Sequence, residues 1–274
     1  MMKKIIILFM LLMTGCANAV HRETSSIMDW VGAADFELIT IPTARFDLTA
    51  LGPPINSDAI RFLSIYIEGD GHAWISRSRI SPDPTPKDPI ALKLMLVHPN
   101  VNAAYLARPC QYVRGDKARN CLNGYWTSKR FSVEVLESMN SAVSALKERY
   151  NASQVELIGY SGGGAIATLL ASRRTDVSRV ITVAGNLDHR KWTQKKKLTP
   201  LSGSENPADY AGGLGDLPQL HFVGARDAIM GPDIAASYFA NLPVPHKATI
   251  DVIKEFDHWC CWVDDWKRLY PSFE

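Results

Sequence analysis

The stretch that most constrains this chain covers residues 154–167 and reads QVELIGYSGGGAIA. Its apolar first half predicts a buried strand, and its alanine-rich end predicts a helix. Between them, residues 159–163 (GYSGG) fit a sharp strand-to-helix turn, in which glycines are needed because side chains would meet the neighbouring strand and helix. Such a turn exposes the hydroxyl of Ser161 beside the unpaired N–H groups of a helix N-terminus. The sequence therefore predicts that Ser161 is a nucleophile.

The first residues predict that the mature protein leaves the cytosol. A basic start at residues 3–4 precedes an apolar run at residues 5–13, then small residues and Cys16. The run is shorter than the ~20 residues that span a bilayer, so it fits a signal peptide better than a transmembrane helix. Its ending resembles a bacterial lipobox, which implies cleavage before Cys16 and acylation of that cysteine. An ordinary secretory signal, cut after Ala17 or Ala19, is the alternative.

The length of 274 residues suffices for one large α/β domain. We expect a signal peptide over 1–15, a tether over 16–34 and one folded domain over 35–274. A lipid anchor would attach the protein to the cell envelope, at the outer membrane or the periplasmic face of a Gram-negative bacterium. Without residues 1–15, 28 basic side chains remain against 28 acidic ones. Nucleic-acid-binding domains usually carry a clear basic excess, so nucleic acid is not an expected partner.

The remaining cysteines are Cys110, Cys121, Cys260 and Cys261. Four cysteines allow three pairings, and the sequence alone does not choose among them. Cys110 and Cys121 bracket a polar loop, and a disulfide that closed its base would contribute about 3 kcal/mol. The adjacent pair would then form a vicinal disulfide or stay reduced. The spacings match no zinc-ligand pattern, so we expect no metal site.

The pattern of apolar residues predicts strands that alternate with helices. Besides the strand before Ser161, strands are expected at 36–41, 46–51, 62–68, 102–108, 179–184, 220–224 and 248–252. Besides the helix after Ser161, helices are expected at 90–97, 133–150, 232–242 and 262–269. The first two strands alternate polar and apolar residues around Pro42, as an antiparallel pair does. The later alternation of strands and helices implies a parallel sheet covered on both faces.

This order of elements, with the serine turn after the fifth strand, resembles the α/β-hydrolase fold over nearly the whole mature chain. The resemblance implies a mostly parallel central sheet with helices on both faces and antiparallel strands at its N-terminal edge. Residues 188–216 lie where this family often inserts a lid. The segment is polar and only ~30 residues long, which is too short for a full cap domain.

In that fold a serine, an acid and a histidine follow one another in the chain, each at the C-terminal end of a strand. By this resemblance the acid is Asp227, just beyond the strand at 220–224, and the base is His258, beyond the last strand. Asp188, after the preceding strand, is the alternative acid. His258 would take the proton of Ser161, and Asp227 would orient the imidazole and stabilise its protonated form.

The family also needs two backbone N–H donors for the oxyanion of the tetrahedral intermediate. Gly162, directly after the nucleophile, would supply one. The loop after the third strand, residues 68–72 (EGDGH), takes the place of the family's His-Gly-x loop. This match assigns the second donor to the backbone of Asp70. Glutamate stands here where the family has histidine.

The matched residues imply a serine hydrolase that cleaves carboxylic esters, of small molecules or of lipids, through an acyl-enzyme. Thioesterases, acyltransferases and peptidases use the same triad on this fold. A surface lipoprotein that kept the fold for binding is the non-enzymatic alternative. The reaction requires no cofactor. No feature of the sequence specifies an oligomeric state.

Overall fold

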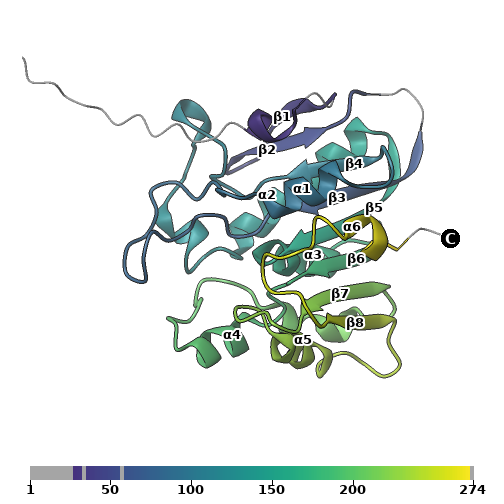
Figure 1. Ribbon diagram of the computed structural model, residues 1–274. Helices are drawn as coiled ribbons and strands as arrows, with labels where there is room; N and C mark the ends of the chain where they lie inside the picture. Colours follow the sequence, from purple (N-terminus) through teal and green to yellow (C-terminus); the bar gives the residue numbers. More distant parts are fainter. Residues whose placement is uncertain (1–26, 33–34, 56–58, 272–274) are drawn as a thin grey trace, which may run out of the picture.

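The computed structural model describes residues 27–32, 35–55 and 59–271 (Figure 1). The expected signal peptide and the expected acylation site, Cys16, lie outside the described residues. Within those ranges, no helix has both the length and the apolar character needed to cross a bilayer.

A single sheet of eight strands runs through the domain in the order β1-β2-β4-β3-β5-β6-β7-β8 (Figure 1). The strands are β1 Glu37–Pro42, β2 Asp47–Gly52, β3 Ile60–Ile67, β4 Ala103–Leu106, β5 Ala152–Tyr160, β6 Val177–Val183, β7 Gln219–Gly224 and β8 Ala248–Ile253. β2 is antiparallel to β1 and to β4, whereas all neighbours from β4 to β8 are parallel. The predicted fold class is therefore confirmed, including the antiparallel N-terminal edge.

Helices cover both faces of the sheet. They are α1 Ile90–Leu96, α2 Val133–Arg149, α3 Gly162–Ala171, α4 His189–Lys196, α5 Pro232–Phe239 and α6 Trp266–Leu269. Successive residues of a strand point to opposite faces. On β3, Ile65 and Ile67 accordingly pack with α2 and α3, while Tyr66 packs with α1 and α6. This alternation places one apolar layer on each side of the sheet.

Two segments differ from their predictions. The polar residues after β6 contain α4, which the apolar pattern did not indicate, and two short 3₁₀ turns before β7. As expected, they form no cap domain. The last helix is shorter than predicted, because residues 262–265 form turns and α6 begins only at Trp266. The fully buried Trp262 is held in those turns by a hydrogen bond from its indole N–H to the carbonyl of Asp257, 3.0 Å long.

A charged pair is buried beneath the C-terminal residues. Glu156 of β5 is completely buried and pairs with Arg179 of β6. Its carboxylate also accepts hydrogen bonds from the hydroxyls of Ser64 (2.9 Å) and Tyr270 (2.7 Å). Burial raises the pKa of Glu156, and the guanidinium of Arg179 opposes that shift. The cation is therefore needed to keep this carboxylate inside the sheet.

We expect Arg179→Met to lower the free energy of unfolding by about 3–5 kcal/mol, because it leaves Glu156 buried without its cation. Urea denaturation at neutral pH measures this loss. The matched control is Arg268→Met, whose side chain is 65% exposed and pairs with Asp265. An exposed pair of this kind contributes less than about 1 kcal/mol. Equal losses in the two variants would contradict the assigned role of Arg179.

Candidate active site

The site is built around the turn between β5 and α3. Ser161 occupies that turn with φ 50° and ψ −117°, a region that residues other than glycine rarely adopt. Its N–H donates to the carbonyl of Val183 on β6 (2.9 Å), and its carbonyl accepts from the N–H of Asn186 (2.9 Å). Hydrogen bonds to the neighbouring strand and to the loop after it therefore hold the turn.

Two glycines of the motif allow the turn to pack closely. A Cβ at Gly159 would meet the backbone of Gly163, and a Cβ at Gly163 would meet the carbonyl of Ile67 at the end of β3. No side chain fits at either position. The sequence predicted that glycines are needed in this motif because side chains would meet the neighbouring strand and helix. The structure confirms this at Gly159 and Gly163.

The structure brings Ser161, His258 and Asp227 together in a hydrogen-bonded chain. The Oγ of Ser161 lies 3.1 Å from Nε2 of His258, and Nδ1 of His258 lies 2.8 Å from Oδ2 of Asp227. The three residues follow β5, β8 and β7, whose C-terminal ends meet at one edge of the sheet. Each is less than one-tenth exposed. An imidazole between a hydroxyl and a carboxylate can take a proton from the first and be stabilised by the second.

Asp227 uses its two carboxylate oxygens for different partners. Oδ2 faces His258, while Oδ1 accepts hydrogen bonds from the backbone N–H groups of Ile229 and Met230, both 2.7 Å long. Asp227 thus caps the turn that follows it through one oxygen and contacts His258 through the other. The backbone bonds fix the carboxylate, and the carboxylate in turn fixes the imidazole.

The loop that carries His258 is anchored on both sides of the histidine. Asp257 accepts hydrogen bonds from the N–H groups of Trp259 (2.8 Å) and Cys260 (2.7 Å), and these bonds lower its pKa. The hydroxyl of Tyr160, one residue before the serine, donates to the carbonyl of His258 (3.0 Å). Asp257 therefore shapes the loop and does not contact the imidazole through any hydrogen bond of the described residues.

Asp188, the alternative acid, has a different role. It is the N-cap of α4, where its Oδ1 accepts from the N–H groups of Arg190 and Lys191, both at 3.1 Å. Its Oδ2 accepts from the hydroxyl of Ser237 (2.7 Å). Asp227, and not Asp188, is the acid in hydrogen-bond contact with His258.

The loop after β3 lies against the serine turn. A Cβ at Gly69 would stand 3.4 Å from the Cβ of Ser161 and 3.2 Å from the ring of Tyr160. Within the described ranges, the N–H groups of Asp70 and Gly162 donate no hydrogen bond. The oxyanion role of these two N–H groups stays a prediction.

Glu68 holds the loop after β3 through a hydrogen bond to its backbone. Its buried carboxylate accepts hydrogen bonds from the N–H of Gly69 (2.9 Å) and the hydroxyl of Tyr105 (3.2 Å), and from the N–H groups of Ala91 and Leu92 in α1. Burial raises its pKa to about 7, although these hydrogen bonds act in the opposite direction. The glutamate at this position thus fixes the loop by accepting backbone N–H groups, which a carboxylate does well.

Of the three pairings that the sequence left open, the structure has Cys110 with Cys121 and Cys260 with Cys261. The disulfide between Cys110 and Cys121 closes the base of the loop after β4, and that between Cys260 and Cys261 follows His258 within three residues. No group of three or more potential metal ligands occurs among the residues that the structure describes.

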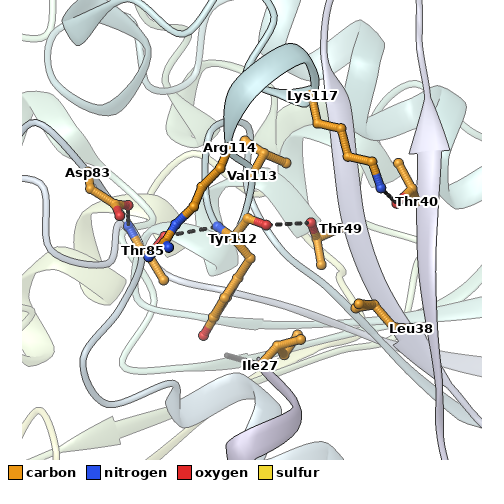
Figure 2. Close-up of a pocket in the computed structure, with 10 residues that line it drawn as sticks. All are labelled: Ile27, Leu38, Thr40, Thr49, Asp83, Thr85, Tyr112, Val113, Arg114 and Lys117. Atoms are coloured by element: carbon orange, nitrogen blue, oxygen red, sulfur yellow. Dashed lines mark hydrogen bonds between the residues drawn. The ribbon is translucent and has the colours of Figure 1, made fainter. Parts of the chain in front are cut away.

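Two cavities lie apart from the triad. The first, about 260 Å³, opens between the β1–β2 pair and the loop closed by Cys110 and Cys121 (Figure 2). Across it, Lys117 donates to the hydroxyl of Thr40 (3.1 Å), and the N–H of Tyr112 donates to Thr85 (2.9 Å). The second, about 520 Å³, is lined by α4 and the residues after it. None of the lining residues belongs to the Ser161–His258–Asp227 chain.

Solved structures of other proteins share this architecture. An esterase from Pyrococcus furiosus superposes with a TM-score of 0.60 at 12% identity, over 86% of this chain and 87% of its own. A putative dienelactone hydrolase from Klebsiella pneumoniae superposes with a TM-score of 0.58 at 18% identity, over 85% of this chain and 95% of its own. GrgF, an α/β hydrolase from Penicillium, superposes with a TM-score of 0.60 at 15% identity, over 85% of this chain and 94% of its own. The chain has the α/β-hydrolase fold.

At these identities the similarity concerns the α/β-hydrolase fold and does not extend to activity. No model of a known protein family matches the sequence, and no curated protein does. The chemistry of each residue at the C-terminal edge of this α/β-hydrolase sheet therefore depends on its own contacts.

The contacts of the two aspartates predict opposite results for their amides. Asp227→Asn should slow the reaction of Ser161 with a fluorophosphonate probe by about 10⁴-fold, because an amide no longer holds the required imidazole tautomer. Asp188→Asn should change the rate less than about threefold, since asparagine is also a good N-cap. The measurement is the second-order labelling rate. A larger loss in Asp188→Asn than in Asp227→Asn would refute this assignment.

Proposed function

We propose that this protein is a serine hydrolase that cleaves carboxylic esters through an acyl-enzyme. The observation that carries the proposal is the continuous chain from the hydroxyl of Ser161 through His258 to Asp227, with contacts of 3.1 and 2.8 Å. A buried imidazole that contacts a hydroxyl on one side and a carboxylate on the other is arranged for nucleophilic catalysis.

The first half of the reaction follows from these contacts. Oγ of Ser161 attacks the ester carbonyl while Nε2 of His258 takes its proton. The imidazolium is stabilised by Asp227, which accepts the Nδ1–H. Collapse of the tetrahedral intermediate breaks the bond to the alcohol oxygen, and His258 returns the proton to that oxygen. The acyl group remains on Ser161 as an ester.

The second half releases the acid. A water molecule attacks the acyl carbonyl, and His258 takes its proton as general base. The second tetrahedral intermediate expels Oγ of Ser161, which recovers the proton from Nε2. In both halves, the N–H groups of Asp70 and Gly162 stabilise the negative charge on the carbonyl oxygen.

An ester is the simplest substrate for this site. Solved structures with the same fold include esterases from Pyrococcus furiosus and Butyrivibrio proteoclasticus. The indole of Trp259 is 59% exposed and lies 5.4 Å from the ring of His258, so an apolar acyl or alcohol group can contact it directly. An exposed aromatic surface of this kind favours apolar esters over small polar ones.

Ser161→Ala should abolish labelling by a fluorophosphonate and lower the turnover of p-nitrophenyl esters by at least about 10⁴-fold. The matched control is Ser172→Ala at the other end of α3, where the hydroxyl donates to the carbonyl of Leu169 and accepts from Arg173. It should label like the wild type. Labelling that survives in Ser161→Ala would refute the nucleophile, and an unreactive wild type would favour a binding protein.

The same experiment separates the related activities. The wild type is assayed against esters of graded acyl length, thioesters and peptides, with Ser161→Ala as the blank for each. We expect the highest kcat/KM for an ester. A higher kcat/KM for a thioester or a peptide would be consistent with the triad but would show that the proposed substrate class is wrong.

A further inference from the structure

A cluster of three charged residues lies beside the proposed oxyanion hole. The carboxylate of Asp70 accepts from Arg108, with Nη1 3.4 Å from Oδ1, and its Oδ2 pairs with Nη1 of Arg130. The side chains of the two arginines are only 5% and 6% exposed, and that of Asp70 is 17% exposed. We call these three residues the Asp70 cluster. The resemblance to the α/β-hydrolase fold implied a role for the backbone of Asp70 but none for its side chain or for either arginine.

Both guanidinium groups are held in place by more than the carboxylate. Arg108 donates through Nη2 to the carbonyl of Arg130, and it lies over the ring of Phe131 at 5.3 Å. Arg130 donates through Nε to the carbonyl of Thr127 (2.7 Å) and lies over the indole of Trp192 at 5.9 Å. A guanidinium fixed by stacking and by backbone acceptors is a rigid anchor. The Asp70 side chain is thus attached to a fixed support.

The cluster joins three segments that are distant in the sequence. Asp70 follows β3, Arg108 follows β4 and Arg130 precedes α2. The carboxylate also packs directly against the serine turn, because a Cβ at Gly162 would meet Oδ1 of Asp70. One side chain therefore contacts the residue that bears one oxyanion donor, and its own backbone bears the other.

The charge of this carboxylate makes the arginines necessary. A negative side chain beside a forming oxyanion opposes catalysis, because both charges lie in a partly buried site of low dielectric constant. Two guanidinium groups on one carboxylate remove that opposition. Burial lowers the pKa of Arg108 to about 10, which still leaves it charged at neutral pH.

We propose that Arg108 and Arg130 are positioning residues of the oxyanion hole. They fix the Asp70 side chain against Gly162, which sets the direction of the Asp70 N–H, and they neutralise the carboxylate next to the forming oxyanion. The inference rests on the proposed serine hydrolase function and adds to it two residues that never contact the substrate.

Arg130→Met tests the proposal. We expect kcat for a p-nitrophenyl ester to fall about 100- to 1,000-fold, as it does when one oxyanion donor is lost. KM should change less than about threefold, because the ground-state carbonyl depends little on these donors. The inhibition constant of a trifluoromethyl ketone, which forms the oxyanion on Ser161, should rise by the same factor as kcat/KM falls. Arg130→Lys, which keeps the charge, should recover part of the loss.

The control is Arg174→Met, which breaks a comparably buried ion pair elsewhere. The Arg174 side chain is 8% exposed and pairs with Asp176 beyond the C-terminal end of α3. It should lose stability in urea and keep its kcat. If Arg130→Met fails to fold, Arg130→Lys and Arg108→Lys replace it, with a fall in kcat expected in both.

A variant series with unchanged kcat, or one in which only KM rises, would overturn the inference. So would a loss of kcat in Arg174→Met as large as that in Arg130→Met, since that result assigns the effect to stability alone. The proposed function fails separately, through an unreactive wild type or an active Ser161→Ala. If both of those behave as expected and Arg130→Met retains its kcat, only the role of the Asp70 cluster is wrong.

Discussion

The backbone of Ser161 adopts a conformation that costs an L-residue of order 1–3 kcal/mol, and the surrounding residues compensate for that cost. Its N–H and its carbonyl are hydrogen-bonded to Val183 and Asn186, and Gly159 and Gly163 remove the side chains that would push the turn apart. The turn directs the hydroxyl out of the sheet and places the N-terminus of α3, beginning at Gly162, beside it. The acid, the base and the second donor loop all lie around this fixed point.

The groups around the serine are held by backbone contacts as much as by one another. Asp227 receives two N–H groups on the oxygen that does not face His258, and His258 is fixed through its carbonyl by Tyr160. Glu68 holds the loop of the second donor through the N–H of Gly69. Each proposed catalytic group therefore has a partner that restricts its motion, which is the condition for preorganised catalysis. The Asp70 cluster extends the same arrangement to the oxyanion donors.

Much of this architecture was accessible from sequence because it follows from local patterns. The glycines around Ser161 and the apolar period of the strands predicted the turn and the sheet, and the order of elements identified Asp227 and His258. α4 was missed because its sequence is polar and its N-cap, Asp188, resembled a catalytic acid. The last helix was predicted too long because the hydrogen bond from the Trp262 indole to the Asp257 carbonyl, which helps to hold residues 262–265 in turns, has no apolar signature.

The residues that sequence reasoning did not find act through contacts between distant segments. Arg108 and Arg130 reach Asp70 across 38 and 60 positions, and Glu68 reaches Tyr105 across 37. No periodicity records such pairs, although an arginine two residues after a buried strand, as at Arg108, is a weak signal that a buried anion lies nearby. These contacts depend on which strands are neighbours in the sheet, and the order of residues in the sequence does not give that.

The central claim is that an acyl group is transferred to Ser161. Its most direct test is mass spectrometry of the wild-type protein, quenched in acid during turnover of a slowly deacylating ester. The account predicts a mass increase of one acyl group per chain, located on the peptide that contains Ser161 and lost on further incubation. An acyl group on any other residue, or turnover with no covalent adduct at early times, would contradict it.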